Sequence, residues 1–250
     1  MPENHILLSL PAEEYSRITA CSVPVTLQQH LVLQEAGAPI DHVYFLDSGM
    51  VSLLTGGRDG RAIETAVVGR EGLVGGKVVL GASQPNGQAV VQLSARGLKT
   101  PTAQFVRCYR ELPALFDLVN RQVGLLLFQA EQNTLCHALH SIEARFCRWL
   151  LQASDRLDSN MLELTQEACS QNLGVQRTSI SMVAHSLQLA GYIRTRRGKV
   201  EILDRARLED TACECYALVR QRFGTAPSKA VKDSVPLIGR EIRPAAGFGD

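Results

Sequence analysis

The segment from Ala168 to Val200 contains several basic side chains but no carboxylate. The chain as a whole is balanced, with 26 lysines and arginines against 25 aspartates and glutamates. A carboxylate on a surface that approaches phosphates would repel the polyanion, so an acid-free basic segment is suited to phosphate binding. The segment therefore predicts contact with a nucleic acid. Its basic residues are Arg177, Arg194, Arg196, Arg197 and Lys199.

Two groups of cysteine and histidine residues are candidate metal ligands. Cys136 and His140, with His137 between them, are four residues apart, so on a helix they share a face and could bind zinc. A structural zinc site needs four ligands, so we expect a small buried cysteine and a capping histidine instead. Cys213 and Cys215 would point apart on a helix and would form neither a clamp nor a disulfide. The sequence thus predicts no metal site.

Neither enzymatic chemistry nor a membrane location is indicated. The chain lacks a G-x-S-x-G sequence, a phosphate-binding loop and an H-E-x-x-H sequence, so we expect no enzyme.

No apolar run approaches the length of a membrane span, and the N-terminus lacks a secretory pattern. Seven cysteines without an export signal are expected to stay reduced. We therefore predict a cytoplasmic protein, whose 250 residues suffice for one large or two modest domains.

Two short helices joined by a tight turn are predicted in and just before the basic segment. Thr165 is expected to cap the first helix, and Gly174 allows the left-handed turn that follows it. The second helix runs from about Gln176 to Ala190 and ends at Gly191. A hairpin with its turn at residues 197–198 comes next. This order is that of a winged helix-turn-helix, whose second helix enters the major groove of double-stranded DNA.

The candidate DNA contacts lie on the cap, on the outer face of the second helix and on the hairpin. Residues 141–224 hold 12 basic and 10 acidic side chains, and this local excess favours a specific DNA contact over a general coating of nucleic acid. The candidates are Thr165, Gln176, Arg177, Thr178, Ser179, Ser181, Met182, His185, Arg196, Arg197 and Lys199.

Short β-runs and then a long helix are predicted before this region. Glycine turns separate the runs VPVTL, HLVLQ, DHVYFL, MVSLL, IETAVV, KVVL and AVVQL, which predict a barrel or jelly roll. The helix begins at Pro113 and is apolar on two faces. One face can cover the β-domain, and the other is expected to meet a second subunit, although burial within one chain is the alternative. The predicted dimer interface comprises Phe116, Val119, Val123, Leu126, Leu127 and Ala130.

These elements predict an α+β chain in four parts. Residues 1–112 form a β-roll domain, and residues 113–140 form a dimerisation helix and hinge. Residues 141–224 form the winged helix-turn-helix domain, which opens with a helix over 142–157 and closes with one over 205–223. Residues 225–250, with several prolines and glycines, are expected to be a disordered tail.

Four segments carry a resemblance to a known family: DHVYFLDSGMVSLL (41–54), VGREGLVGG (68–76), LTQEACSQNLGVQRTSISMVAHSLQLAGYI (164–193) and RTRRGKVEILD (194–204). In these segments and in the order of its elements, the sequence resembles the Crp/Fnr family of bacterial transcription regulators over roughly residues 5–220. The resemblance implies a cyclic-nucleotide-binding-like β-roll that acts as the sensor domain (1–112), a long dimerisation helix and a C-terminal winged helix-turn-helix. It also implies a homodimer on a palindromic promoter site, with RNA polymerase as a further partner.

The resemblance also implies roles for single residues. Arg177 matches the family's first base reader, which donates to guanine, and Thr178 and Met182 fall at the other two base-facing positions. Thr165 and Ser179 match positions that contact phosphate. Thr178 and Met182 depart from the residue types usual there, so the operator sequence is left open.

The sensor region departs further from the family's pattern. Cyclic AMP is held there by a Gly-Glu pair and a later Arg-Ser or Arg-Thr pair, whereas this chain has Arg70-Glu71 and no basic residue in GASQPNGQ (81–88). Because a buried phosphate without a cation is costly, we expect no cyclic AMP. Only Cys21 lies near the N-terminus, so we expect no iron–sulfur cluster there. The effector is left open, with a candidate pocket of Arg70, Glu71, Ser83, Asn86 and Gln88.

Two other hypotheses stay open. The first is an architectural DNA-binding protein without an effector, which a ligand-induced change in DNA affinity would exclude. The second is a β-roll module that docks a partner protein, which would leave the acid-free segment unexplained.

Overall fold

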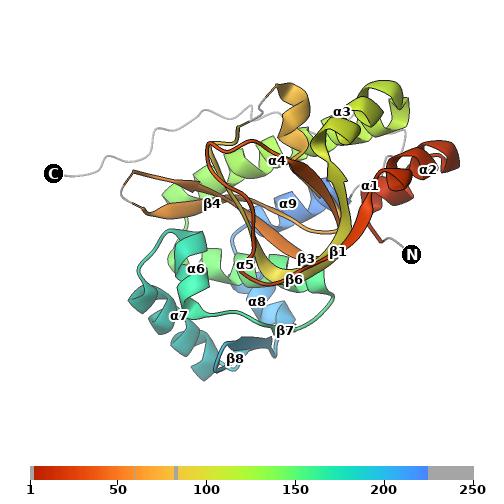
Figure 1. Cartoon of the computed structure of the whole chain (residues 1–250). Helices are drawn as coiled ribbons and strands as arrows, with labels where there is room; N and C mark the ends of the chain where they lie inside the picture. The colour runs from red at the N-terminus through yellow and green to blue at the C-terminus, as the bar shows by residue number, and fades with distance from the viewer. Residues whose placement is uncertain (1–2, 59, 82–83, 225–250) are drawn as a thin grey trace, which may run out of the picture.

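The computed structural model describes residues 3–58, 60–81 and 84–224. An N-terminal roll of antiparallel strands leads into one long helix, and a helical domain with a small sheet follows (Figure 1). The expected α+β class and order of elements are confirmed. The predicted tail lies outside the described residues.

The roll is built on a six-stranded sheet, with the order β1–β6–β3–β4 and two short strands that pair with β6 and β3. The predicted strands near residues 42–46 and 50–54 are one strand, β3, which bends where its register with β6 shifts. Gly49 lies at this bend with φ 84°, and a Cβ there would come within 2.5 Å of the Ser94 carbonyl oxygen, so glycine is required. The strands are β1 (Val23–Leu27), β2 (Val32–Gln34), β3 (His42–Gly56), β4 (Ala62–Val68), β5 (Leu73–Val74) and β6 (Gly87–Pro101).

The predicted strand KVVL, residues 77–80, is wrong. These residues lie in a 3-10 helix, η1 (Gly76–Leu80), between two left-handed glycines, Gly75 with φ 94° and Gly81 with φ 80°. Each glycine turns the chain sharply, and the short segment between them cannot follow a neighbouring strand.

The long helix α4 (Pro113–Leu139) covers the edge strand of the roll with a face that is partly polar. Gln129 Oε1 accepts a hydrogen bond from Val67 N at 3.3 Å, and Asn133 Nδ2 donates to Thr65 O at 3.0 Å. These contacts satisfy backbone groups of β4, which is the last strand of the sheet order on this side. Helices α1 (His5–Leu8), α2 (Ala12–Ala20) and α3 (Thr102–Glu111) share a core with β3 and the first half of α4.

The predicted dimer interface is wrong at two positions on α4. Val119 and Leu126 are 0% and 6% exposed and pack into the cores of their own roll. Phe116 and Leu127 are 44% and 62% exposed and lie on the adjacent, solvent-exposed side of the helix. The apolar pattern alone did not separate the two faces because polar side chains occupy part of the buried one.

The helical domain begins with α5 (Ile142–Leu157), which lies between the roll and the helix-turn-helix. The side chain of Trp149 on this helix is fully buried in a core that also contains Met50 and Val67 of the roll. The two halves of the molecule therefore share one hydrophobic core. The remaining elements are β7 (Met161–Leu162), α6 (Gln166–Leu173), α7 (Arg177–Leu189), β8 (Ile193–Arg196), β9 (Lys199–Ile202), α8 (Arg205–Thr211) and α9 (Cys215–Gly224).

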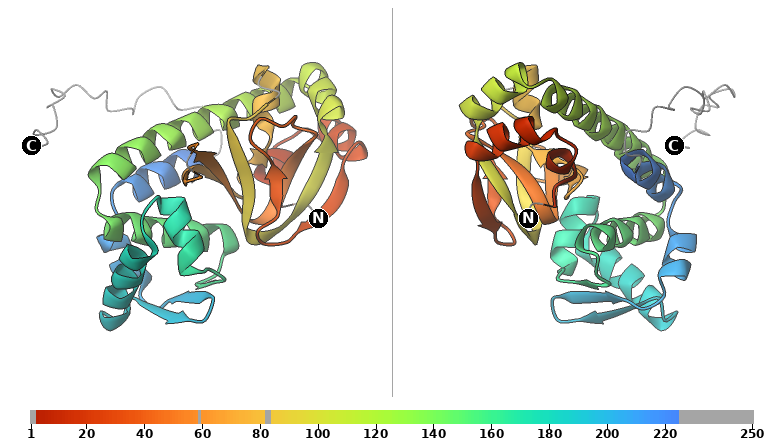
Figure 2. Two further views of the ribbon diagram at one scale, coloured as in Figure 1. Left: turned by 60° about the vertical axis from the view of Figure 1, so that its left-hand side comes forward. Right: turned by 90° about the vertical axis from the view of Figure 1, so that its right-hand side faces the viewer.

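The predicted helix over residues 205–223 is broken. Ala212 has an extended backbone (φ −68°, ψ 151°), so α8 ends at Thr211 and α9 begins at Cys215. The break turns the chain so that α9 lies alongside the C-terminal half of α4, and Tyr216 and Val219 become buried (Figure 2). The free energy that burial of these side chains contributes exceeds the free energy that an unbroken helix would contribute.

Candidate nucleic-acid interface

Local capping sets the geometry of the two helices. Thr165 Oγ1 accepts a hydrogen bond from Ala168 N at 3.1 Å and begins α6 as predicted. Gly174 ends α6 with φ 62°, and Gln176 precedes α7 in an extended conformation. The side chain of Ile63 from the roll lies against this turn, where a Cβ on Gly174 would be 3.1 Å from its Cδ1 atom. The turn therefore needs glycine both for its backbone angles and for this contact.

Helix α7 is buried on one face and exposed on the other. Ile180, Ala184 and Leu187 are at most 2% exposed and belong to the shared core. Met182 is 67% exposed, an unusual value for a large apolar side chain. The other exposed candidates on and before this helix are Gln176, Arg177, Thr178 and His185.

Two serines of the predicted interface are half-buried. Ser181 Oγ donates to Gln166 Oε1 at 2.7 Å and lies 3.1 Å from the carbonyl oxygen of Arg177. It ties α6 to α7, so its hydroxyl is engaged between the helices, contrary to the expectation that it lies on the exposed face. Ser179 is also half-buried, near the start of α7.

The hairpin of β8 and β9 has the predicted turn, with Gly198 at φ 71°. Arg196 and Arg197 are exposed. Lys199 forms an ion pair with Glu163 at 2.9 Å, which the sequence did not indicate because β7 brings Glu163 to β9 from outside the acid-free segment. The pair is exposed, so it contributes little stability and can be exchanged for another anion.

The hairpin and the helix-turn-helix enclose a hollow of about 460 Å³. Thr165 and Arg177 line it from the helices, and residues 195–199 line it from the hairpin. The structure thus brings the cap, the start of α7 and the wing, which are up to 34 residues apart in the chain, to a single concave basic surface.

The predicted effector pocket is wrong in its composition, because Arg70 and Glu71 line a cavity of about 320 Å³ that includes neither Asn86 nor Gln88. Arg70 binds Asp158 through both guanidinium nitrogens, at 2.5 and 2.8 Å, and Glu71 accepts two hydrogen bonds from Arg156 at 2.6 and 3.0 Å. Both residues therefore join the roll to α5, and the Arg70 hydrogen bond lowers the pKa of Asp158. Asn86 is exposed and Gln88 donates to Glu35 at 2.6 Å, away from this junction, while Ser83 lies outside the described residues.

A buried carboxyl group lies where the roll meets the helical domain. Glu64 on β4 is 3% exposed and accepts hydrogen bonds from Ser52 and from Trp149 Nε1, the latter at 3.0 and 3.2 Å. Burial raises the pKa of Glu64 to about 7, against the effect of these hydrogen bonds and of Arg148 and Arg156. A single acid within the strand IETAVV carried no sequence signal of this role.

The expectation that the two groups of cysteine and histidine residues bind no common metal is wrong in its geometric premise, because the structure brings them together. Because the helix breaks before Cys213, the ligand atoms of Cys136, His140, Cys213 and Cys215 all lie within 4.8 Å of one another. Hydrogen bonds from Cys136 and Cys213 lower the pKa of Cys215. His137 does not join this cluster, and burial beside Arg145 lowers its pKa to about 4.

Comparisons with known proteins agree with this geometry. Residues 144–211 match the Crp-like helix-turn-helix domain family. A Crp/Fnr-family protein from Eubacterium rectale has a TM-score of 0.66 and 16% identity, over 83% of this chain and 97% of that one. The c-di-GMP-responsive global regulator of Xanthomonas campestris has a TM-score of 0.64 and 16% identity, over 77% and 99%. A Crp/Fnr-family transcriptional regulator from Thermus thermophilus has a TM-score of 0.62 and 21% identity, over 76% and 98%.

No curated protein matches the chain. The matched model shows that residues 144–211 form a Crp-like helix-turn-helix domain, and the solved structures show that the chain shares the fold of Crp/Fnr-family proteins. The expected resemblance and fold are therefore confirmed. Within the described residues, no helix combines the length and the apolarity needed to cross a bilayer.

Proposed function

We propose that the chain binds double-stranded promoter DNA as a homodimer, recognises a palindromic site and thereby regulates transcription. One observation carries this proposal: the outer face of α7 is exposed, has no carboxylate, and adjoins the basic hollow formed with the wing. Direct readout of a base sequence needs such a helix in the major groove, and the basic wing would hold the adjoining backbone.

The side chains on this face suit particular bases. Arg177 is exposed at the first position of α7, and its guanidinium can donate two parallel hydrogen bonds to guanine. Met182 lies on the same exposed face, where its apolar side chain could contact the methyl group of thymine. Thr178 and His185 complete the proposed readout, and Thr165 and Ser179 lie toward the backbone phosphates.

The outer face of α4 supports the homodimer. Phe116, Val123 and Ala130 recur every seven residues, and Leu127 lies between the last two on the same stripe. Such a spacing is that of a coiled-coil seam, and it would place two copies of α4 side by side. A two-fold dimer would present two copies of α7 to the two halves of a palindrome.

The proposed signal is not a cyclic nucleotide. Residues 81–88 carry no basic side chain, and Arg70 and Glu71 are engaged with α5. We expect neither cyclic AMP nor cyclic GMP to bind at micromolar concentration, which calorimetry with each nucleotide would test. The proposal includes a cytoplasmic location and contact with RNA polymerase, without enzymatic activity.

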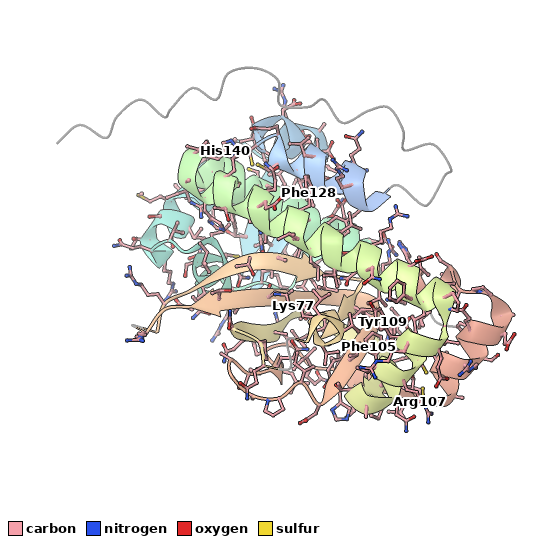
Figure 3. The ribbon with its side chains drawn as sticks, turned by 90° about the horizontal axis from the view of Figure 1, so that it is seen from above. Lys77, Phe105, Arg107, Tyr109, Phe128 and His140 are labelled. Atoms are coloured by element: carbon pink, nitrogen blue, oxygen red, sulfur yellow. The ribbon has the colours of Figure 1, made fainter. Side chains whose placement is uncertain are left out.

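The experiment begins with selection of bound duplexes from a random DNA pool. The selected sequence is expected to be palindromic. Arg177→Ala should weaken binding to it by about 1–3 kcal/mol while changing binding to random DNA much less. The matched control is Arg107→Ala, which removes an exposed arginine on α3, far from α7 in the chain (Figure 3). Equal weakening on both DNAs would mean that Arg177 touches only phosphate, and failure to enrich any sequence would contradict the proposal.

A further inference from the structure

The last turn of α4 and the start of α9 converge on a buried group of three thiols and one imidazole. The Cys136 and Cys213 sulfurs are 3.5 Å apart, and Cys215 Sγ is 3.5 Å from His140 Nδ1. Figure 3 labels His140 at the end of α4, beside the ribbon of the C-terminal helices. All three cysteines are at most 8% exposed.

These distances match the edges of a coordination tetrahedron. Zinc–sulfur bonds of about 2.3 Å place two sulfurs of a tetrahedral site about 3.8 Å apart. A disulfide would need a sulfur–sulfur distance of about 2 Å, so the 3.5 Å separation is a contact between free thiols. Three cysteines and one histidine also form one of the usual ligand sets of structural zinc.

The surroundings orient the four groups for a metal. His140 Nε2 lies 3.1 Å from Glu214 Oε1, so Nε2–H can donate a hydrogen bond to the carboxylate and the unprotonated Nδ1 faces the thiols. Gln132 Nε2 donates to Cys215 Sγ at 3.0 Å, as expected for a hydrogen bond to a thiolate ligand.

The charge of the site is complementary to its neighbours. Arg145 and Arg148 are 6% and 1% exposed, and neither has a carboxylate within ion-pair distance in the part of the chain that the structure describes. A buried cation needs an opposite charge nearby. A doubly charged metal with three thiolates and a neutral imidazole carries one net negative charge. Arg148 interacts electrostatically with Cys136 and Cys213, so its positive charge can balance the net negative charge of the metal with its ligands.

We propose that Cys136, His140, Cys213 and Cys215 bind one zinc ion per chain. Thiolate and imidazole ligands in tetrahedral geometry favour zinc over magnesium or calcium. The ligands come from α4, from the turn that follows it, and from the loop and helix at the end of the helical domain. The zinc ion thus fastens α9 to α4 beside the turn at residues 140–141 that joins α4 to α5.

The test uses the full-length protein, purified without oxygen and with a reductant, then exposed to Zn²⁺ and freed of excess metal. Elemental analysis is expected to give one zinc per chain. Cys213→Ser with Cys215→Ser should reduce the zinc content at least tenfold. The matched control is Cys21→Ser with Cys108→Ser, which removes two other neighbouring thiols, 3.8 Å apart, and should leave the zinc in place.

Two further measurements keep the proposal testable if the serine variants fold poorly. Wild-type protein loaded with Co²⁺ should show thiolate charge-transfer bands and the absorption of tetrahedral cobalt. Glu214→Gln, at an exposed side chain, should keep the fold and weaken zinc binding about tenfold. A wild-type protein that takes up no zinc, a serine variant that keeps it, or a Cys136–Cys213 disulfide in the anaerobic protein would each overturn the proposal.

Discussion

Glu64 shows how one side chain can make the stability of this fold depend on pH. Its carboxyl group is covered by Trp149 of the helical domain, and its pKa is about 7 in the folded chain against 4.5 for an ordinary glutamate. A folded-state pKa above the unfolded value means that the native state holds a proton which the unfolded chain releases. The stabilisation is complete below about pH 4.5 and is lost as the pH rises through about 7.

Glu64→Gln should remove this pH dependence, because glutamine keeps an acceptor for Trp149 and Ser52 without ionising. The free energy of unfolding of the wild type, relative to the variant, is expected to fall by about 2–3 kcal/mol between about pH 5 and pH 8. Urea unfolding of both proteins at both pH values measures this difference. Glu131→Gln, at an exposed site on α4, serves as the control, and a difference that does not change with pH would contradict the prediction.

At the scale of single elements, the wing should bind phosphates through its two exposed arginines. Replacing Arg196 and Arg197 by alanine should lower affinity for all DNA sequences. It should also reduce the slope of log K against log salt by roughly 0.9 for each phosphate that the wing no longer neutralises. Lys199→Ala should have a smaller effect, because its ammonium must first leave Glu163. Titrations at several salt concentrations measure the slope, with Lys77→Ala on η1 as the control. Weaker binding with an unchanged slope would mean that the wing acts through folding.

The structure separates the exposed from the buried apolar residues of α4, so the proposed dimer interface can be tested with exposed residues alone. Phe116→Asp with Leu127→Asp changes only exposed side chains and should give a folded monomer with reduced DNA affinity. Leu126→Asp would instead bury a charge in the roll and destabilise the fold. Leu218→Asp, at another exposed leucine on α9, controls for reduced surface apolarity. Sedimentation measures the mass, and a double variant that remains dimeric would rule out this stripe as the interface.

At the scale of the whole molecule, two ion pairs that link the roll to α5 should differ strongly in their contribution to stability. The Arg156 and Glu71 side chains are 9% and 13% exposed, whereas those of Arg70 and Asp158 are 28% and 65% exposed. Removing one partner of a buried pair leaves an uncompensated charge, while an exposed pair is screened by water.

Arg156→Met is therefore expected to lower the free energy of unfolding by about 3 kcal/mol or more. Asp158→Asn should lower it by less than about 1 kcal/mol. Chemical denaturation of both variants in one buffer measures the two decreases, and a thermal midpoint for each checks that unfolding remains a single transition. Similar decreases would show that burial does not set the contribution of these pairs.

Much of the recognition region could be predicted from the sequence because its structure is decided locally. Thr165 caps the helix that follows it, Gly174 and Gly198 take the left-handed angles that their turns require, and α7 has a helical apolar period. Hydrogen bonds within a few residues and side-chain periodicity determine such features, so no knowledge of the rest of the fold was needed.

Only the tertiary structure decided which segments meet. The buried face of α4 includes Gln122, Gln129 and Asn133, which a search for apolar residues overlooks but which bond to the backbone of the roll. Arg70 and Glu71 bind Asp158 and Arg156, and the cavity that they line is shared with the helical domain and does not include Asn86 or Gln88. The side chains of Cys136, His140, Cys213 and Cys215 converge because the last helix breaks between α8 and α9. The same break allows Tyr216 and Val219 to be buried. In each case the deciding interaction joins residues far apart in the chain, and local propensity carries no information about such interactions.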